Sequence, residues 1–236
     1  MALRPMSFQD YPVARARMVR EQIIPGGITD PRVLDAMQAV PRHLFLDHEA
    51  GSEAYSNHAF PIGHAQTMSQ PYMVAYLAQE LELQGNENIL EIGTGSGYQA
   101  AVLSRLASNV CSIERIPGLA RRAEAIFDRL RIESVFVKTG DGARGWCERA
   151  PFDRILLTAA AAGVPEALVT QLAEGGFLLG PVADGKTKQH IVKLTRRHNS
   201  FHLEKLRDCS FVPLVRGTAE HPGAPQPPAI PRCEKN

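Results

Sequence analysis

The chain has 236 residues, of which 44% are hydrophobic and 22% are charged, and its formal net charge at pH 7 is +1. That size and composition are typical of a single globular domain with its own core. Because Lys and Arg are spread along the chain, the charge pattern argues against a nucleic-acid partner or a membrane-surface partner.

The first third of the chain combines helical patterns with one long irregular segment. The leading residues lack the apolar core of a signal peptide and no run approaches the ~20 apolar residues of a membrane span, so we expect a cytoplasmic chain. A first helix is expected over 15–24, and a second has Asp30 as its cap and Pro31 as its first residue. Residues 51–71, rich in Gly, Ser, Asn and Pro, predict a long surface loop, and a third helix begins near Pro71.

From residue 88 onward, strand and helix patterns alternate. Strands are predicted over 88–93, 109–114, 134–139, 153–158 and 176–182, and helices over 98–108, 118–131 and 165–173. This order predicts crossover connections and therefore a doubly wound α/β fold, with a mostly parallel sheet covered by helices on both faces. Two or three further strands within 189–197 and 200–214, with no helix between them, predict an antiparallel addition at one edge.

These elements predict one domain over residues 1–217. It comprises N-terminal helices and a loop (1–87), an α/β core (88–182) and C-terminal strands (183–217), followed by a Pro-rich tail (218–236) that we expect to be disordered. The four cysteines are far apart and form no C-x-x-C pair, so neither a metal site nor a disulfide framework is expected.

A glycine-rich turn follows the first strand of the core, in the stretch "LEIGTGSGY". Gly93, Gly95 and Gly97 allow positive φ and a close approach of a ligand to the backbone. A dinucleotide fingerprint would place its third glycine where Tyr98 stands, which disfavours a nicotinamide cofactor. A strand-to-helix turn without a ligand is the alternative reading.

Acidic residues end the neighbouring strands. Glu91 precedes the turn and, with the turn's carbonyls, could surround the ammonium and sulfonium groups of a ligand. Glu114 ends the second strand, where a carboxylate can accept hydrogen bonds from both hydroxyls of a ligand's ribose. Asp141, before Gly142, ends the third strand, where it could meet an adenine edge. Each acid alone could be a solvated strand end, but together they favour a ligand site at the carboxyl ends of the parallel strands.

The motifs "LEIGTGSGY", "SIER" and "GDG" resemble the S-adenosylmethionine-binding motifs of class I methyltransferases. More specifically, the chain resembles the protein-L-isoaspartate O-methyltransferase family from about Met18 to Gly217, through "MVREQI", "AYSNHAFPIGHAQTMSQPYMVA", "APFDRILLTAA", "PEALVTQLAEGG" and "FVPLVRG". The segments "QTMSQP" and "FVPL" are the most specific of these.

The resemblance implies methyl transfer from S-adenosylmethionine to the free α-carboxyl of L-isoaspartyl residues in damaged proteins and peptides, with repair through a succinimide. It implies Ser69 as the catalytic residue. The expected cofactor-binding residues are Thr67, Glu91, Gly93, Thr94, Gly95, Gly97, Glu114, Arg115, Asp141 and Gly142, and the expected substrate-binding residues are Phe60, Pro61, Ile62, Val212, Pro213 and Leu214. No metal is expected, and the protein is taken as a monomer by default.

Ser69 needs no basic partner in this chemistry. A carboxylate with a reference pKa near ~4 is ionised at neutral pH and is itself the nucleophile, so a hydroxyl that orients it is sufficient. The alternative role for Ser69 is that of a helix N-cap, because it lies two residues before Pro71.

Two other functions stay open: a class I methyltransferase for another peptide carboxyl, and a non-catalytic module that binds the cofactor or damaged peptides. The sequence also departs from the family, with Ala65 and Ala183 where glycine is usual. If the glycine replaced by Ala65 has positive φ, the backbone just before "QTMSQP" is strained.

Overall fold

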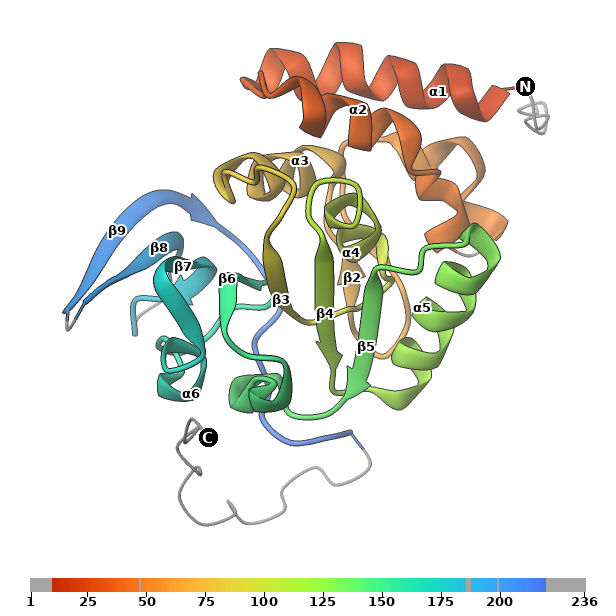
Figure 1. The fold of residues 1–236 in the computed structure, drawn as a ribbon. Helices are drawn as coiled ribbons and strands as arrows, with labels where there is room; N and C mark the ends of the chain where they lie inside the picture. Colours follow the sequence, from red (N-terminus) through yellow and green to blue (C-terminus); the bar gives the residue numbers. More distant parts are fainter. Residues whose placement is uncertain (1–9, 47, 186–187, 199, 220–236) are drawn as a thin grey trace.

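A computed structural model of the chain describes residues 10–46, 48–185, 188–198 and 200–219, and Figure 1 shows its fold. A seven-stranded sheet forms its centre, in the order β5-β4-β3-β6-β7-β8-β9, and β1 and β2 form a separate pair. The strands are β1 (Phe60–Pro61), β2 (Thr67–Met68), β3 (Asn88–Ile92), β4 (Asn109–Glu114), β5 (Val135–Thr139), β6 (Phe152–Leu157), β7 (Leu172–Ala183), β8 (Gln189–Arg197) and β9 (Ser200–Cys209).

Helices connect and cover these strands. They are α1 (Asp10–Met18), α2 (Pro31–Ala39), α3 (Pro71–Glu80), α4 (Tyr98–Leu103), α5 (Pro117–Leu130) and α6 (Glu166–Val169), with a π-helical turn η1 (Val19–Ile23) and 3₁₀ turns η2 (Ile24–Gly26), η3 (Arg42–Phe45), η4 (His48–Tyr55), η5 (Gly142–Arg144) and η6 (Cys147–Arg149). The side chain of Asp30 accepts from Arg32 N at 2.9 Å, which confirms the predicted cap of α2.

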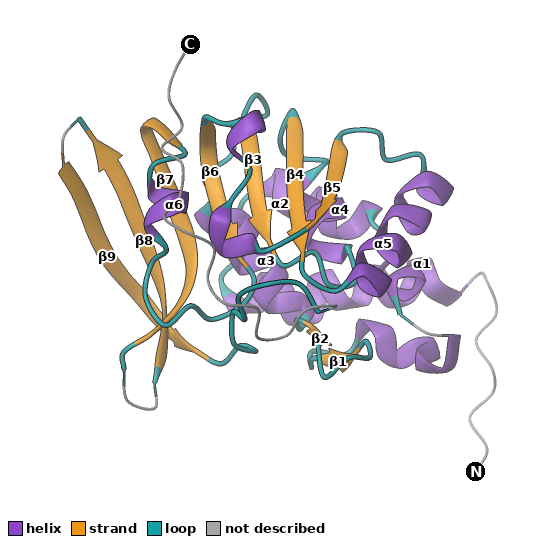
Figure 2. Ribbon diagram, turned by 90° about the horizontal axis from the view of Figure 1, so that it is seen from below, coloured by secondary structure: helices purple, strands orange, loops and turns teal. Residues whose placement is uncertain are grey.

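The predicted fold class is confirmed. Strands β5, β4, β3, β6 and β7 run parallel, whereas β8 and β9 are antiparallel additions at one edge. Side chains of β3 alternate between two apolar clusters: Ile89 joins the cluster formed with α3, α4 and α5, while Leu90 and Ile92 join the cluster with α6. Figure 2 shows helices on both sides of the sheet.

Three predicted helices differ from the structure at their ends. Helix α1 begins at Asp10, five residues before the predicted start, and α4 ends at Leu103 rather than at residue 108. The helix predicted over 165–173 has only the four residues of α6. It stops because Leu172 already pairs with Phe152 of β6, so strand pairing prevails over a helical pattern that continues in the sequence.

The surface loop predicted over 51–71 is also corrected. Part of η4 lies within it, and β1 pairs with β2 as a small antiparallel hairpin. Tyr55, Ile62 and Met68 from this segment are buried in the main core cluster. Their apolar side chains anchor a segment whose polar composition suggested a solvent-exposed loop.

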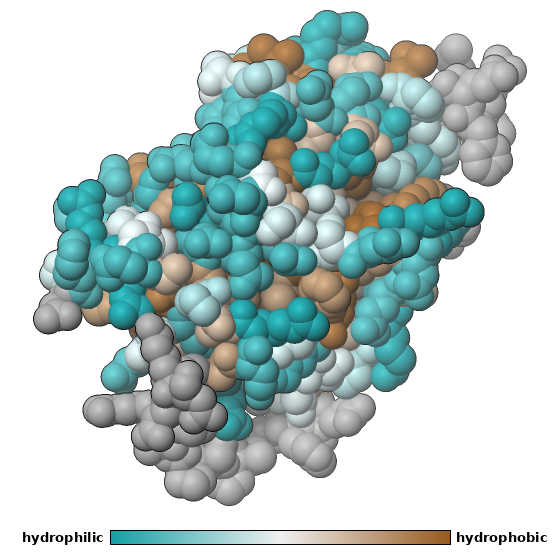
Figure 3. Space-filling view, in the orientation of Figure 1, coloured by the Kyte–Doolittle hydropathy of each residue, from teal (hydrophilic) through white to brown (hydrophobic). Residues whose placement is uncertain are grey.

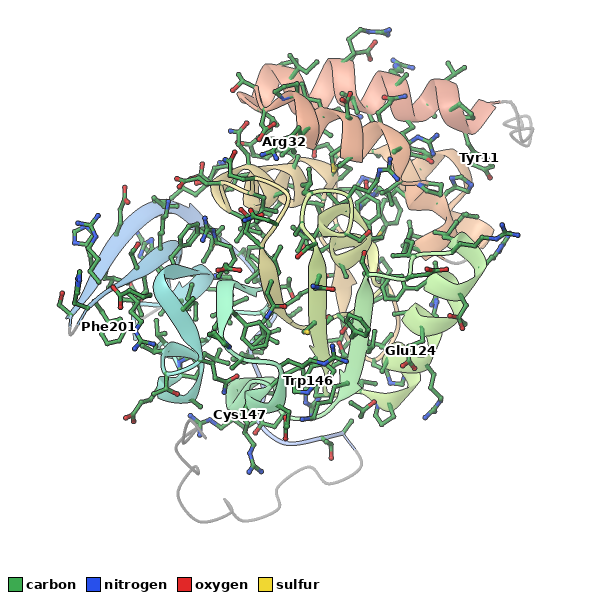
Figure 4. All side chains as sticks on the ribbon, viewed as in Figure 1. Tyr11, Arg32, Glu124, Trp146, Cys147 and Phe201 are labelled. Atoms are coloured by element: carbon green, nitrogen blue, oxygen red, sulfur yellow. The ribbon has the colours of Figure 1, made fainter. Side chains whose placement is uncertain are left out.

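Strands β8 and β9 project from the body as a long hairpin (Figures 1 and 4). Phe201, labelled on β9 in Figure 4, is half exposed. Figure 3 shows mainly hydrophilic side chains on the face seen in Figure 1, with smaller apolar areas between them. Within the described ranges, no helix is long and apolar enough to cross a membrane, and residues 220–236 of the predicted tail lie outside those ranges.

Candidate active site

A cavity lies at the carboxyl ends of β3, β4 and β6, and segments distant in the sequence meet there. Its lining comes from the 66–69 segment, α3, the glycine turn, the first turn of α4, the end of β4, the residues after β6 and the C-terminal segment. Seven of the predicted site residues line it: Thr67, Ser69, Gly93, Thr94, Gly95, Glu114 and Val212. The structure thus joins the segment that carries Ser69 to the glycine turn and to Glu114.

The glycine turn has the backbone that its sequence predicts. Gly93, Gly95 and Gly97 have φ of 102°, 54° and 88°, a region that residues with a Cβ rarely adopt. A Cβ on Gly93 would collide with Thr158 Oγ1, and one on Gly97 would stand 2.8 Å from Phe127 Cζ of α5. The turn therefore needs glycine for close packing as well as for its dihedral angles.

Glu114 organises the floor of the cavity. Its Oε2 accepts from Gly95 N at 2.8 Å, and its Oε1 accepts from Ile116 N at 2.9 Å. A carboxylate has about four acceptor positions, so each oxygen retains one for a ligand. The side chain is only 4% exposed yet lines the cavity, which places two fixed, unused acceptor positions at the end of β4.

Asp141 lies on the neighbouring strand end, because Gly140 N donates to Glu114 O at 2.9 Å. Its own carboxylate accepts from Ala143 N at 3.0 Å, which caps the short turn η5. Gly142 packs tightly against Ile92, with no room for a Cβ. Asp141 and Gly142 do not line the cavity itself.

Ser69 is held through its main chain by a buried arginine. Arg42 is fully buried, and its Nη2 donates to Ser69 O at 2.7 Å while its Nε donates to Ala54 O at 2.8 Å. Its guanidinium carbon lies 4.8 Å from the ring centroid of Tyr98, the first residue of α4. Burial lowers the pKa of Arg42 to about 10, so the group stays charged at neutral pH.

The hydroxyl of Ser69, by contrast, has no hydrogen-bond partner among the described residues. The N-cap of α3 is Gln70, whose side chain makes no capping hydrogen bond, and the side chain that accepts from the first turn is Asn57, whose Oδ1 lies 3.3 Å from Tyr72 N. The alternative role of Ser69 as a helix cap is therefore wrong, and its hydroxyl is available to a ligand in the cavity.

Glu91 does not reach the cavity. Its side chain is fully buried and its Oε2 accepts from Ser112 Oγ at 2.5 Å. The Ser112 hydroxyl also pairs with Thr94 Oγ1 at 2.6 Å, and Thr94 lines the cavity. Burial, supplemented by the nearby Glu114 carboxylate, raises the pKa of Glu91 to about 8. Glu91 is thus mostly neutral at pH 7 and acts on the turn through two hydroxyls.

The predicted substrate segments lie beside the cavity. Val212 O accepts from Ala160 N, and Leu214 N donates to Ala160 O, both at 2.8 Å, so residues 212–214 run extended along the chain that follows β6. On the other side, Ile62 Cδ1 lies 3.4 Å from the Cβ position of Gly95. Phe60, Pro61, Pro213 and Leu214 flank these residues but do not line the cavity.

Arg115 anchors the end of the described chain. Its Nε donates to Gly217 O at 3.3 Å, and its carbonyl accepts from Ala219 N at 2.9 Å. Arg115 and Gly97 are absent from the cavity lining.

The sequence reading missed several residues of this site. Thr158 donates toward Ile92 O and Gly93 O at 2.8 and 2.6 Å, and lines the cavity; its place at the end of a predicted strand was a usable signal. Gln99 also lines the cavity, but nothing in its surroundings in the sequence distinguishes it from an ordinary helix residue. Within the described ranges, no cluster of three or more His, Cys, Asp or Glu side chains is arranged to hold a metal ion.

A larger hollow of about 450 Å³ lies elsewhere, between α2, α4 and the C-terminal end of α5. It is at the amino ends of the strands, where Ser134 precedes β5. Ligand sites of parallel α/β sheets lie at the carboxyl ends, so we place the candidate active site in the smaller cavity.

Comparison with known proteins agrees with this geometry. The family model for protein-L-isoaspartate(D-aspartate) O-methyltransferase matches residues 14–219. Protein-L-isoaspartate O-methyltransferase of Syntrophotalea carbinolica is 50% identical over 208 residues, which are 87% of this chain and 95% of that protein. The enzyme of the same name from Geobacter metallireducens is 48% identical over 207 residues, again 87% and 95% of the two chains.

Solved structures give the same result for the fold. A protein-L-isoaspartate O-methyltransferase superposes with a TM-score of 0.79 at 28% identity, covering 84% of this chain and 65% of that longer one, just under two thirds. A Plasmodium falciparum protein, solved with S-adenosyl-L-homocysteine, superposes with a TM-score of 0.74 at 24% identity over 85% of this chain and 97% of its own. The chain belongs to the protein-L-isoaspartate O-methyltransferase family.

Proposed function

We propose that this chain transfers a methyl group from S-adenosylmethionine to the free α-carboxyl of L-isoaspartyl residues in damaged proteins and peptides, which initiates their repair through a succinimide. The observation that carries this proposal is the cavity in which the Ser69 segment faces the glycine turn and Glu114. When bound, S-adenosylmethionine supplies an electrophilic methyl group. The residues present fit this cofactor, because Gly93, Gly95 and Gly97 of the turn carry no Cβ atom and Glu114 keeps two unused acceptor positions.

In this proposal the residues divide into two groups by what they hold. Glu114 accepts the ribose hydroxyls. The other proposed cofactor-side residues are Thr67, Glu91, Gly93, Thr94, Gly95, Gly97, Arg115, Asp141 and Gly142, with Glu91 acting through Ser112 and Thr94. The peptide side comprises Phe60, Pro61, Ile62, Val212, Pro213 and Leu214, on two segments that border the cavity.

Ser69 is the proposed catalytic residue. Its free hydroxyl donates a hydrogen bond to the substrate carboxylate and fixes the direction of the attacking oxygen. No general base is required, because the carboxylate is already ionised. Among the described residues that line the cavity, Glu114 is the only one with an acidic or basic side chain, so neutral donors hold the substrate anion.

The test is transfer of labelled methyl to two matched peptides, one with L-isoaspartate and one with L-aspartate, read out as base-labile methanol. Label on the isoaspartyl peptide alone supports the proposal. Label on both peptides, or on the aspartyl peptide, assigns the enzyme to another peptide carboxyl. Binding of S-adenosylhomocysteine without transfer to either peptide contradicts the proposed enzyme activity and favours a binding module.

We also propose that the protein works in the cytoplasm as a monomer, on protein and peptide substrates and without a nucleic-acid or membrane partner. The formal charge of +1 supports the last part of this proposal, because a chain with so little net charge has only a weak overall attraction to nucleic acid or an anionic membrane. Size-exclusion chromatography with light scattering tests the monomer, and a nucleic-acid gel-shift assay tests the absence of that partner.

A further inference from the structure

Gln99 carries a polar group that the protein itself does not satisfy. The residue stands in the first turn of α4, directly after the glycine turn, and is 9% exposed. Its Nε2 is buried and has no hydrogen-bond partner among the described residues. The side chain lines the same cavity as Ser69 and Glu114.

A buried carboxamide without a partner is unfavourable for the folded protein, because the group loses its hydrogen bonds to water and gains none. An apolar side chain of similar size would fit the apolar part of the lining, where Val74 and Leu77 of α3 lie, without that penalty. The donor therefore points to a ligand that supplies an acceptor when it enters the cavity.

Three other polar side chains of the lining, those of Gln66, Thr94 and Ser96, already have a hydrogen-bond partner within the protein. Gln66 Nε2 donates to His64 O at 3.2 Å, and Thr94 Oγ1 pairs with Ser112. Ser96 Oγ accepts from Tyr98 N at 3.3 Å. Gln99 thus differs from Gln66, the other carboxamide of the lining, in that its Nε2 is buried and has no partner among the described residues.

The charge of the cavity narrows the choice of ligand group. Within the described residues, no Lys, Arg or His lines the cavity, so an anionic ligand group has to be held by neutral donors such as a carboxamide or a hydroxyl. Glu114 is an acceptor and is suited to hydroxyls rather than to a carboxylate, which it would repel.

We propose that the Gln99 carboxamide binds the amino-acid head group of S-adenosylmethionine, with Nε2 donating to its carboxylate. This inference rests on the proposed cofactor and adds a specificity-determining residue to the site. Gln99 then distinguishes ligands that carry the head group from adenosine thioethers that lack it, whereas Glu114 contributes equally to the binding of both kinds of ligand.

The experiment compares two ligands by isothermal titration calorimetry on the full chain. S-adenosylhomocysteine carries the head group, whereas 5′-methylthioadenosine has the same adenosine and thioether without it. The variants are Gln99→Met, which keeps the size and removes the donor, and Gln99→Glu, which replaces the amide by a carboxylate. Gln84→Met is the matched control, since Gln84 is exposed and is not among the residues that line the cavity.

We expect Gln99→Met to weaken S-adenosylhomocysteine binding by about tenfold or more, as for a lost hydrogen bond to a charged group, with little effect on 5′-methylthioadenosine. Gln99→Glu should weaken S-adenosylhomocysteine binding further, because its carboxylate repels the carboxylate of the ligand's head group. Without ligand, Gln99→Met melts at or above the temperature of the unmodified protein, because an unsatisfied amide has been removed. A side chain with only a structural role would instead lower that temperature.

Several results would overturn the inference. Equal weakening of both ligands assigns Gln99 to the general shape of the site, and tighter binding by Gln99→Glu places the side chain at the ammonium instead. Unchanged S-adenosylhomocysteine affinity with a higher KM for the isoaspartyl peptide assigns it to the substrate. If the unmodified protein itself fails to bind S-adenosylhomocysteine, the proposed cofactor is wrong, and this result needs no variant.

Discussion

Replacing Glu91 by Gln tests whether a neutral carboxyl group lies beneath the glycine turn. Glu91 is fully buried on β3, its Oε2 accepts from Ser112 and its Oε1 has no partner among the described residues. Burial raises its pKa to about 8 from an ordinary value of 4.5. A glutamine has nearly the same shape, keeps a hydrogen bond to Ser112 and does not titrate.

The sign of the effect follows from proton binding. Between pH 4.5 and about 8, the folded state holds the Glu91 proton and the unfolded state has released it, so the folded state binds more protons and stability falls as pH rises. The contribution of Glu91 is complete below pH 4.5 and is lost as pH rises through about 8. At about 1.4 kcal/mol per pKa unit, the unmodified protein loses roughly 2–3 kcal/mol relative to Glu91→Gln between about pH 5 and about pH 7.

The assay is urea unfolding of both proteins at half-unit pH steps. Their difference isolates Glu91, because all other titrating groups are shared. We expect a gap in free energy of unfolding that widens with pH and levels off above about pH 9. Glu124→Gln, at an exposed position on α5, should follow the unmodified protein throughout. Parallel curves for Glu91→Gln and the unmodified protein would refute the neutral carboxyl and restore an ionised Glu91.

Three further changes test other parts of the site. Ser69→Ala should lower turnover by about a hundredfold with little change in S-adenosylhomocysteine affinity; unchanged turnover would remove Ser69 from the mechanism. Glu114→Ala should weaken S-adenosylhomocysteine binding at least about tenfold, and an unaltered titration would contradict the ribose assignment. Ala65→Gly should raise the melting temperature by roughly 2–4 °C, because the exposed Ala65 has φ of 54° and left-handed backbone costs about 1 kcal/mol for a residue with a Cβ. Gly63→Ala, with φ of 85° in open space, should lower it, and the same sign for both changes would rule out this explanation.

The parts of the fold that depend on local pattern could be predicted from the sequence. Asp30 and Pro31 start α2 because a capping carboxylate and a fixed φ act within one turn. The glycine turn and Glu114 meet because parallel strands end at the same edge of a sheet, whatever residues separate them. Local chemistry and sheet topology were therefore sufficient to predict these features.

The segment from Gly51 to Pro71 could not be predicted, because tertiary contacts determine its structure. Its two-residue strands are too short to give a periodic signal. The turn between them is closed by a hydrogen bond from Gln66 N to Gly63 O of 2.9 Å, with positive φ at His64 and Ala65. Asn and Gly are the usual residues in that conformation, so His64 and Ala65 give no sequence signal for the turn that they form.

Arg42 helps to position Ser69, yet the sequence motifs of the site do not reveal it. Its hydrogen bonds go to the main-chain carbonyls of Ala54 and Ser69, and a carbonyl acceptor leaves no mark in the sequence, because every residue has one. No carboxylate pairs with Arg42 among the described residues, so two carbonyls and the face of Tyr98 balance its charge. The planar fork of a guanidinium can donate to both carbonyls while it stacks on the ring, whereas the single ammonium of a lysine cannot do both. The position of Ser69, the proposed catalytic residue, relative to the glycine turn therefore depends on a side chain that lies 27 residues before Ser69 and outside both motifs.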